Sequence, residues 1–189
     1  MATLTVTLPL DAARVRSLHA GDIVALHGVL FTARDAAHQR LIAACERNEP
    51  LPIPLVNQVI YYVGPAPAKP GYASGPAGPT TSGRMDPYTI PLLELGVRGL
   101  IGKGIRSPAV VDALVRCGAV YFAAAGGAAA LLARHIVESH VVAYADLGTE
   151  AIRALTVRGF PAVVVNDCHG ADAYAIGRRT YGRKGGDSA

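Results

Sequence analysis

The stretch that decides the fold is residues 99–124, GLIGKGIRSPAVVDALVRCGAVYFAA. It opens with an apolar run, Gly99 to Gly102, which is typical of a short buried strand. Ser107 is a preferred N-cap residue and predicts a helix that continues to Cys117. A second apolar run, Ala119 to Ala124, predicts another strand. This order of strand, helix and strand favours a parallel sheet covered by helices.

The same alternation continues towards the C-terminus. We expect a helix from about Gly127 to Ile136, a strand from Val141 to Tyr144, a short helix from Thr149, and a strand from Ala162 to Asn166. The tail after Tyr181 is expected to be flexible.

The N-terminal half looks more antiparallel. Its predicted elements, in order, are an edge strand within residues 1–8, a short helix from Asp11 to Leu18, a strand from Asp22 to Leu30 that bends at Gly28, a helix from Asp35 to Glu46, a strand from Val56 to Val63, and a helix around Tyr88 to Leu95. The sequence therefore predicts an α/β fold: a layered β/β/α architecture with a mixed, partly parallel sheet. We expect one domain over residues 1–189, with the flexible tail at about 180–189.

Composition narrows the function classes. The chain has 189 residues, of which 51% are hydrophobic and 17% charged, enough for one well-cored domain. No apolar run approaches the roughly 20 residues that a membrane span needs. The N-terminus lacks the features of a secretion signal, and the cysteines Cys45, Cys117 and Cys168 form no CxxC pair, so we expect a cytoplasmic protein with reduced thiols.

The net charge of +4 does not point to nucleic acid. Several of the basic residues lie in the terminal run from Arg178 to Lys184, and no basic helix or interleaved aromatic pattern accompanies them. A basic pocket for a small acidic molecule fits the charge at least as well.

Three short motifs place cations at predicted element junctions. In the first, TARDAAH (32–38), Arg34 stands between a strand and a helix, Asp35 lies in the first helical turn and His38 one turn in. Taken alone, Arg and Asp at a helix entrance more often form a solvated capping pair. Asp35 and His38 are expected to act indirectly, by positioning their neighbours.

The second motif is TTSGR (80–84), where hydroxyls from Thr80, Thr81 and Ser82 stand beside Gly83 and Arg84. Hydroxyls, backbone N–H groups freed by a small residue, and a planar guanidinium are the parts of an anion cradle. An ordinary capping loop with a surface arginine explains this spacing equally well.

The third motif is GKG (102–104), where Lys103 is held between glycines at the end of a strand, the position at which open parallel sheets present ligands. It is not a nucleotide P-loop, because the GxxxxGK[ST] pattern is absent. Together, Arg34, Arg84 and Lys103 predict a site for a small anion, and the residues alone go no further.

A family resemblance goes further. The strings TARDAAHQRL, GPTTSGRMDPY and GKG, followed by AGGAAALLA, DLGTEAI and FPAVVVNDCHG in the same order, resemble the β subunit of two-subunit class I fumarases and related tartrate dehydratases. The resemblance covers roughly Val6 to Tyr174. It implies a swivelling β/β/α domain, an α subunit in an α2β2 assembly, and a tricarboxylic acid cycle hydro-lyase that hydrates fumarate to (S)-malate.

The resemblance also implies roles for residues. Arg34, the run from Thr80 to Arg84 (Thr80, Thr81, Ser82, Gly83 and Arg84) and Lys103 would contact the dicarboxylate, and Thr80 and Arg34 would be catalytic. The 4Fe–4S cluster would belong to the α subunit, with no metal held by this chain, and His169 is not expected to be a ligand. One departure is Ile105, where the family often has a second glycine pair, which puts the shape of that turn in doubt.

Alternatives remain open at this stage. Tartrate or mesaconate are substrates of the same chemistry, and GPTTSGRMD leans towards fumarate. A non-catalytic small-anion-binding module that has lost its partner is the alternative from a different class.

Overall fold

The computed structural model describes residues 2–182. Its fold is built on a seven-stranded β-sheet. The strands, given in chain order, are β1 (Leu4–Thr7), β2 (Ile23–Thr32), β3 (Val59–Tyr61), β4 (Gly99–Gly102), β5 (Val120–Ala123), β6 (Ile136–Ala143) and β7 (Ile152–Asn166). In space they lie in the order β1-β2-β3-β4-β5-β7-β6, and β2 pairs with β7 as well. The pairings of β2, β3, β4, β5 and β7 therefore close into a ring.

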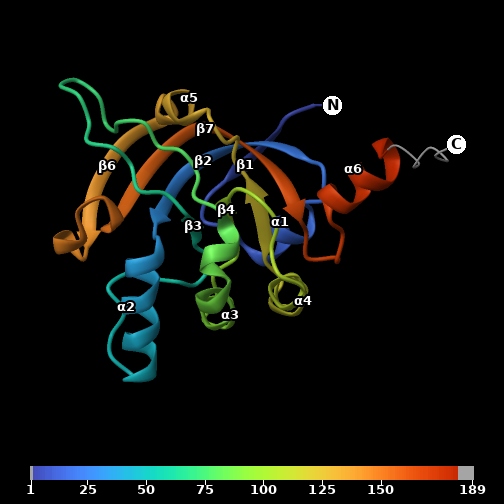
Figure 1. Ribbon diagram of the computed structural model, residues 1–189, viewed down its shortest axis with the longest axis horizontal. Coiled ribbons are helices and arrows are strands. Elements are labelled where there is room, and N and C mark those ends of the chain that lie inside the picture. Colours follow the sequence, from blue (N-terminus) through green and yellow to red (C-terminus); the bar gives the residue numbers. More distant parts are fainter. Residues whose placement is uncertain (1, 183–189) are drawn as a thin grey trace, which may run out of the picture.

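Six helices and two 3-10 turns accompany the sheet in the described residues. The helices are α1 (Ala12–Arg16), α2 (Asp35–Glu46), α3 (Asp86–Glu94), α4 (Pro108–Cys117), α5 (Ala129–Ala133) and α6 (Ala173–Tyr181), and the 3-10 turns are η1 (Ser82–Met85) and η2 (Ala145–Glu150). Figure 1 shows α2, α3 and α4 together beneath the sheet, with β2, β6 and β7 arching above. None of these helices is long and apolar enough to cross a membrane.

Two apolar cores give the molecule its layers. Successive strand residues point to opposite faces, so in β3 Tyr61 enters the core enclosed by the ring of strands while Ile60 enters the core between sheet and helices. The first core includes Phe122 and Phe160. Helices α2, α3 and α4 supply buried leucines to the second core. The layered β/β/α prediction with a mixed, partly parallel sheet is confirmed.

The predicted strand directions are wrong in the N-terminal half. Every neighbouring pair from β1 to β5 is parallel, and the antiparallel pairs are those that β7 makes with β2, β5 and β6. The physical reason lies in the connections. A helix follows β1 and another follows β2, so each crossover returns the chain to the same end of the sheet.

Local predictions succeed where a helix has a clear apolar face or cap. Helix α2 has the predicted bounds, and the Asp11 side chain caps α1 by accepting a hydrogen bond from the Arg14 N–H at 2.7 Å. Strand β4 and the end of α4 at Cys117 also lie as predicted. Ser107 occupies the N-cap position of α4, although its side chain makes no capping bond.

The C-terminal third was predicted less well. The helix expected to reach Ile136 ends at Ala133, because Ile136 is buried in the core and pairs with Val157 as the start of β6. Likewise, β7 begins at Ile152 rather than Ala162, η2 ends at Glu150 rather than beginning at Thr149, and α6 was not foreseen. A flexible tail was predicted at about 180–189. Its first two residues, Thr180 and Tyr181, belong to α6, and residues 183–189 lie outside the described part of the chain.

Gly28 forms the predicted bend in β2. Its φ is +120°, and the pairing with β7 shifts register between Leu26 and Gly28. A Cβ at this position would lie 2.7 Å from the carbonyl oxygen of Leu8. Both the backbone conformation and the lack of space therefore require glycine.

We predict that Gly28→Ala lowers the free energy of unfolding by about 2–4 kcal/mol, because it adds a backbone strain of about 1–3 kcal/mol to an overlap with a backbone oxygen. Urea denaturation measures the change. Gly177→Ala is the control: this glycine lies within α6, nothing approaches the added carbon within 4 Å, and a helical Gly-to-Ala change stabilises by up to about 1 kcal/mol. Equal stability of Gly28→Ala and the parent chain would contradict the assignment.

Candidate active site

The candidate site lies where four parallel strands end. Arg34 follows β2, Gly64 lies just beyond β3, Lys103 follows β4, and Gly126 lies beyond β5. Because β2, β3, β4 and β5 are parallel neighbours, their carboxyl ends meet at one edge of the sheet. This is the edge at which parallel sheets present ligands.

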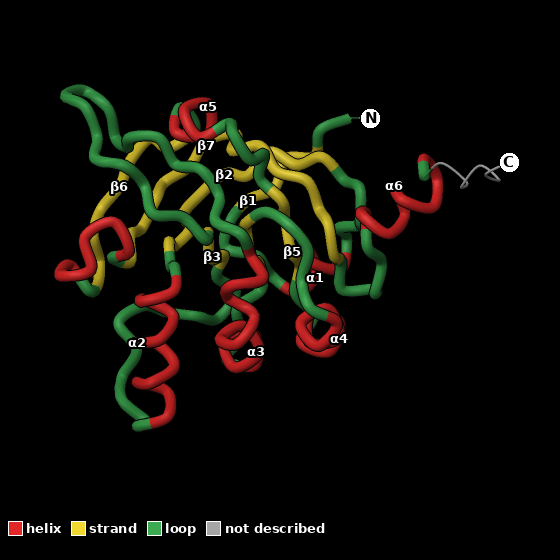
Figure 2. Tube along the Cα trace, viewed as in Figure 1, coloured by secondary structure: helices red, strands yellow, loops and turns green. Residues whose placement is uncertain are grey.

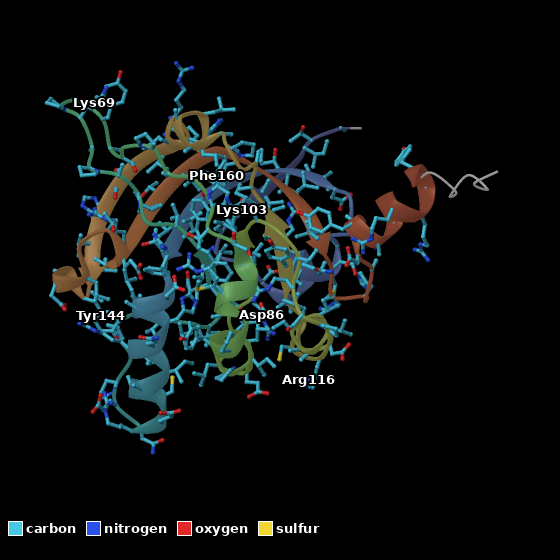
Figure 3. The ribbon with its side chains drawn as sticks, viewed as in Figure 1. Lys69, Asp86, Lys103, Arg116, Tyr144 and Phe160 are labelled. Carbon is cyan, nitrogen blue, oxygen red and sulfur yellow. The ribbon has the colours of Figure 1, made fainter. Side chains whose placement is uncertain are left out.

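The threonine-rich turn is inserted between the ends of β3 and β4. The Thr80 N–H donates to the Tyr62 carbonyl at 2.7 Å, the Lys103 N–H donates to the Thr80 carbonyl at 3.2 Å, and the Ser82 N–H donates to the Lys103 carbonyl at 2.8 Å. The loop that precedes this turn swings away from β3 and back, as Figure 2 shows, and Lys69 marks its tip in Figure 3. Residues far apart in the sequence are thereby joined by backbone hydrogen bonds.

Asp35 links two of the predicted cations. Its carboxylate accepts a two-pronged hydrogen bond from Arg84, at 3.1 Å from Nε and 2.8 Å from Nη2. The Nε of Arg34 lies 3.9 Å from the same carboxylate. Asp35 thus holds the two guanidiniums near each other while offsetting part of their mutual repulsion.

Arg34 has a second acidic neighbour that sequence reasoning missed. Its Nη2 lies 3.5 Å from the Glu150 carboxylate, which also accepts a hydrogen bond from the Ala36 N–H at 3.0 Å. The guanidinium packs beside Gly64, where a Cβ would lie 3.0 Å from Nη1. Glu150 lies in the DLGTEAI string, but nothing in that string predicts a contact more than a hundred residues away.

Lys103 is exposed, and the turn that carries it is fixed by the backbone bonds to Thr80 and Ser82. A Cβ at Gly126 would lie 3.5 Å from the lysine Cδ, so the side chain runs past the turn that follows β5. Figure 3 labels Lys103 near the middle of the molecule, away from the Lys69 loop tip. No protein hydrogen bond or ion pair engages its amino group among residues 2–182.

Besides Arg84, the TTSGR motif contains Thr80, Thr81, Ser82 and Gly83, and these four differ in exposure and in their hydrogen-bond partners. Thr81 and Gly83 are exposed and Thr80 is half-buried, and within the described part of the chain the Thr80 hydroxyl has no protein partner. Ser82 is fully buried, and its hydroxyl contacts the Tyr121 hydroxyl at 2.9 Å. The Ser82 side chain is therefore turned into the protein, and its role as a substrate contact stays a prediction that this geometry does not favour.

His38 is fully buried one turn into α2, next to the backbone of Arg34. Its Nδ1–H donates to the Arg34 carbonyl at 2.8 Å, and its ring packs edge-on against Tyr62 and near Tyr88. Burial lowers the pKa of His38 from 6.5 to about 4, against the raising effect of the Arg34 hydrogen bond. The imidazole is therefore neutral at physiological pH and supports the backbone at Arg34; its indirect role in the reaction stays a prediction.

A scan of family models matches residues 2–177 to one described as fumarase C-terminus. The chain belongs to the fumarase C-terminus family. This confirms the resemblance drawn from TARDAAHQRL and GPTTSGRMDPY.

Relatives within this family differ in length. The chain is 39% identical over 171 residues to "Fumarate hydratase 2" of Leishmania major, which covers 88% of this chain and 30% of the relative. It is 40% identical over 153 residues to "Fumarate hydratase class I, aerobic" of Escherichia coli K12, a match that covers 80% of this chain and 28% of that relative. The chain thus spans less than a third of both relatives. Against a Methanocaldococcus jannaschii protein provisionally named L(+)-tartrate dehydratase subunit beta, it is 37% identical over 174 residues and covers 88% of itself and 89% of that protein.

Residues at the candidate site face solvent: in the described part of the chain, Thr81, Gly83, Arg84 and Lys103 are exposed. Two surface hollows of about 460 and 370 Å³ occur elsewhere, around α6 and around the end of α4, and neither is lined by a predicted site residue. Among residues 2–182, no three or more His, Cys, Asp or Glu side chains are grouped to hold a metal ion. The side chains present therefore do not fit an iron–sulfur cluster, and what they offer is cations and hydroxyls on an open face.

We predict that neutral, buried His38 makes the free energy of unfolding depend on pH between 6.5 and 4. The pKa of His38 is depressed in the folded chain, so the unfolded chain binds the extra proton as pH falls, and unfolding becomes easier by about 3 kcal/mol over that range. Urea denaturation at several pH values measures it. His38→Asn keeps a donor for the Arg34 carbonyl but cannot titrate, so the difference in the free energy of unfolding between parent and variant should be constant above pH 7 and change with pH between 6.5 and 4. A difference that stays constant down to pH 4 would contradict the prediction.

Proposed function

We propose that this chain is the β subunit of a hydro-lyase that interconverts fumarate and (S)-malate, in the cytoplasm, together with an α subunit. The observation that carries the proposal is the joining of three cationic segments at one edge of the sheet, with Arg34 and Arg84 both on Asp35 and the Lys103 turn bonded to Thr80 and Ser82. Family membership supplies the reaction class.

The need for a partner follows from the relatives and from the open face. The chain spans 30% and 28% of two proteins named fumarate hydratase, but 89% of a protein named as a subunit beta. We infer that a separate chain supplies the remaining part, in an α2β2 assembly, and that this chain is a single domain. The 4Fe–4S cluster is assigned to that partner, because the described residues of this chain do not fit one.

The chain's own residues would act on the carboxylates and on one proton. A C4 dicarboxylate loses its hydration on binding, and guanidinium and ammonium groups replace the lost hydrogen bonds. Dehydration of malate removes a proton from the carbon next to a carboxylate, and the negative charge that develops is shared with that carboxylate. Arg34, Arg84 and Lys103 would stabilise that charge, which is worth more in the transition state than in the ground state.

Thr80, deprotonated at its hydroxyl, would accept this proton when malate is dehydrated and return it when fumarate is hydrated. The partner's 4Fe–4S cluster would supply a Lewis acid for the hydroxide that leaves. A threonine hydroxyl is a weak base unless nearby positive charge lowers its pKa, so the proposal requires Arg34 close to Thr80. Both residues approach the end of β3: Thr80 bonds the Tyr62 carbonyl, and Arg34 packs beside Gly64. Thr81 and Gly83 would add an exposed hydroxyl and a backbone N–H to the carboxylate site.

Tartrate is the second candidate substrate, because the relative of matching length is named for it. An anaerobic reconstitution with the α chain, followed by assays on fumarate, L(+)-tartrate and mesaconate, decides between them. We expect the highest kcat/KM with fumarate. Preference for tartrate would replace fumarate in the proposal, and binding without turnover of any substrate would favour a small-anion-binding module.

The isolated chain should be colourless and inactive. We expect no absorbance from an iron–sulfur cluster after anaerobic purification of the chain alone, and full activity only after the α chain is added. Iron–sulfur absorbance in the isolated chain would contradict the division of labour between the two chains.

We predict that Thr80→Val and Arg34→Met each lower kcat of the assembled enzyme roughly 100- to 1,000-fold, the scale of losing one group that stabilises developing charge. Thr80→Val keeps the shape and removes the hydroxyl. Arg40→Met is the matched control, because Arg40 lies on the exposed face of α2 and pairs with Asp146. Its turnover should stay within about twofold of the parent enzyme. Near-parental turnover in either site variant would remove that residue from the mechanism.

A further inference from the structure

A buried arginine joins the two turns that carry the cations. The side chain of Arg106 is fully buried, and its Nε donates to Asp86 at 2.8 Å. The same carboxylate accepts the Ser107 N–H at 2.8 Å. Asp86 directly follows η1, which contains Arg84, while Arg106 and Ser107 follow the Lys103 turn, so Asp86 is a bridge between the two segments. Figure 3 labels Asp86 and Lys103.

The other ends of the guanidinium are engaged as well. Nη1 donates to the Tyr62 hydroxyl at 3.1 Å and Nη2 donates to the Thr89 hydroxyl at 2.7 Å. The guanidinium carbon lies 5.3 Å from the ring centres of both Tyr62 and Tyr121. Burial alone would lower the pKa of Arg106, but Tyr62 and Asp86 raise it by more, so the pKa stays above its ordinary value.

Tyr121 forms a second bridge between the same turns. Its hydroxyl donates to the Gly104 carbonyl at 2.9 Å and contacts the Ser82 hydroxyl at 2.9 Å. The turns approach so closely that a Cβ at Gly102 would lie 1.9 Å from the Ser82 hydroxyl. Two side chains, Arg106 and Tyr121, therefore tie the Lys103 turn to the Thr80–Arg84 turn through different hydrogen bonds.

We propose that Arg106 is a positioning residue, which with Tyr121 fixes the Lys103 turn against the Thr80–Arg84 turn before any anion arrives. Cations brought close together repel one another. Without the two side-chain ties, only the backbone bonds of Lys103 to Thr80 and Ser82 would resist this repulsion, and the turns would be less well ordered before an anion binds. Arginine suits this position because its planar fork reaches three partners at once, which a lysine ammonium on a flexible stem cannot do. The consequence for catalysis rests on the function proposed above.

Hydrogen exchange of the full chain, followed by mass spectrometry, tests the positioning without any activity. Tyr121→Phe removes one hydroxyl and keeps the ring, and Asp86→Asn keeps the shape and removes the charge. We expect amide exchange in residues 81–85 and 102–107 to become roughly tenfold faster in both variants, with other segments unchanged, because each leaves buried groups without partners. Arg106→Lys should show the same pattern if it folds, and the other two variants decide the question if it does not.

The control is Tyr61→Phe, which removes a hydroxyl from an equally buried tyrosine in the neighbouring core. Its hydroxyl donates to the Ala77 carbonyl at 2.6 Å and touches neither turn. Exchange at the two turns should match the parent chain. Unchanged exchange in Tyr121→Phe and Asp86→Asn, or equal acceleration throughout the chain, would overturn the positioning role.

The assembled enzyme supplies a separate readout. Misplacement by about 1 Å lowers rates up to about 100-fold, so we expect kcat/KM of Tyr121→Phe and Asp86→Asn to fall roughly 10- to 100-fold, and Tyr61→Phe to stay near the parent value. Parental kcat/KM in variants with accelerated exchange would overturn the link to catalysis. An inactive parent assembly would sink the proposed function instead, and the exchange result would still decide what Arg106 does.

Discussion

The structure depends on one insertion: the backbone of Thr80 to Ser82 lies between the ends of β3 and β4. Three hydrogen bonds hold it there, one to Tyr62 and two to Lys103. Without them, the loop that leaves β3 would carry its hydroxyls and Arg84 elsewhere. Since β2 and β3 are parallel neighbours, the same insertion brings this segment to the end of β2, where Arg34 and Asp35 begin α2.

The wall that results balances attraction and repulsion among charges. Arg34, Arg84 and Lys103 contribute three positive charges, and Asp35 and Glu150 offset two of them. The carboxylates hold the guanidiniums in place, which reduces the ordering that a ligand must impose. Below this wall, His38 is neutral and Arg106 is charged but paired, so the support adds little unbalanced charge to the face above.

The sequence was informative where chemistry is local. The apolar spacing of α2, the glycine bend at Gly28 and the motifs around Arg34, Thr80 and Lys103 could all be read from short windows, and the resemblance placed them in one family. Strand direction could not, because it is decided by where each crossover returns the chain. The C-terminal elements were misjudged because β6, which is mostly exposed, and β7 are stabilised by pairing with each other rather than by a strong local pattern.

The supporting residues were missed for a related reason. Glu150, Arg106 and Tyr121 meet their partners across long stretches of sequence, and nothing next to them predicts a buried ion pair or a shared hydroxyl. Ser82 is a different case: it was predicted to contact substrate, and its buried hydroxyl contacts the Tyr121 hydroxyl, a contact that its neighbours in sequence do not indicate. Local patterns indicate which chemistry a chain carries, whereas the fold decides which atoms are presented.

The most direct test of the central claim is a crystal structure of this chain assembled with its α subunit and soaked with succinate, an unreactive C4 dicarboxylate. The account predicts that Arg34, Arg84 and Lys103 all donate hydrogen bonds to carboxylates of a single bound molecule, beside the Thr80 hydroxyl. Succinate bound away from this wall, or held without contact to at least two of the three cations, would contradict it.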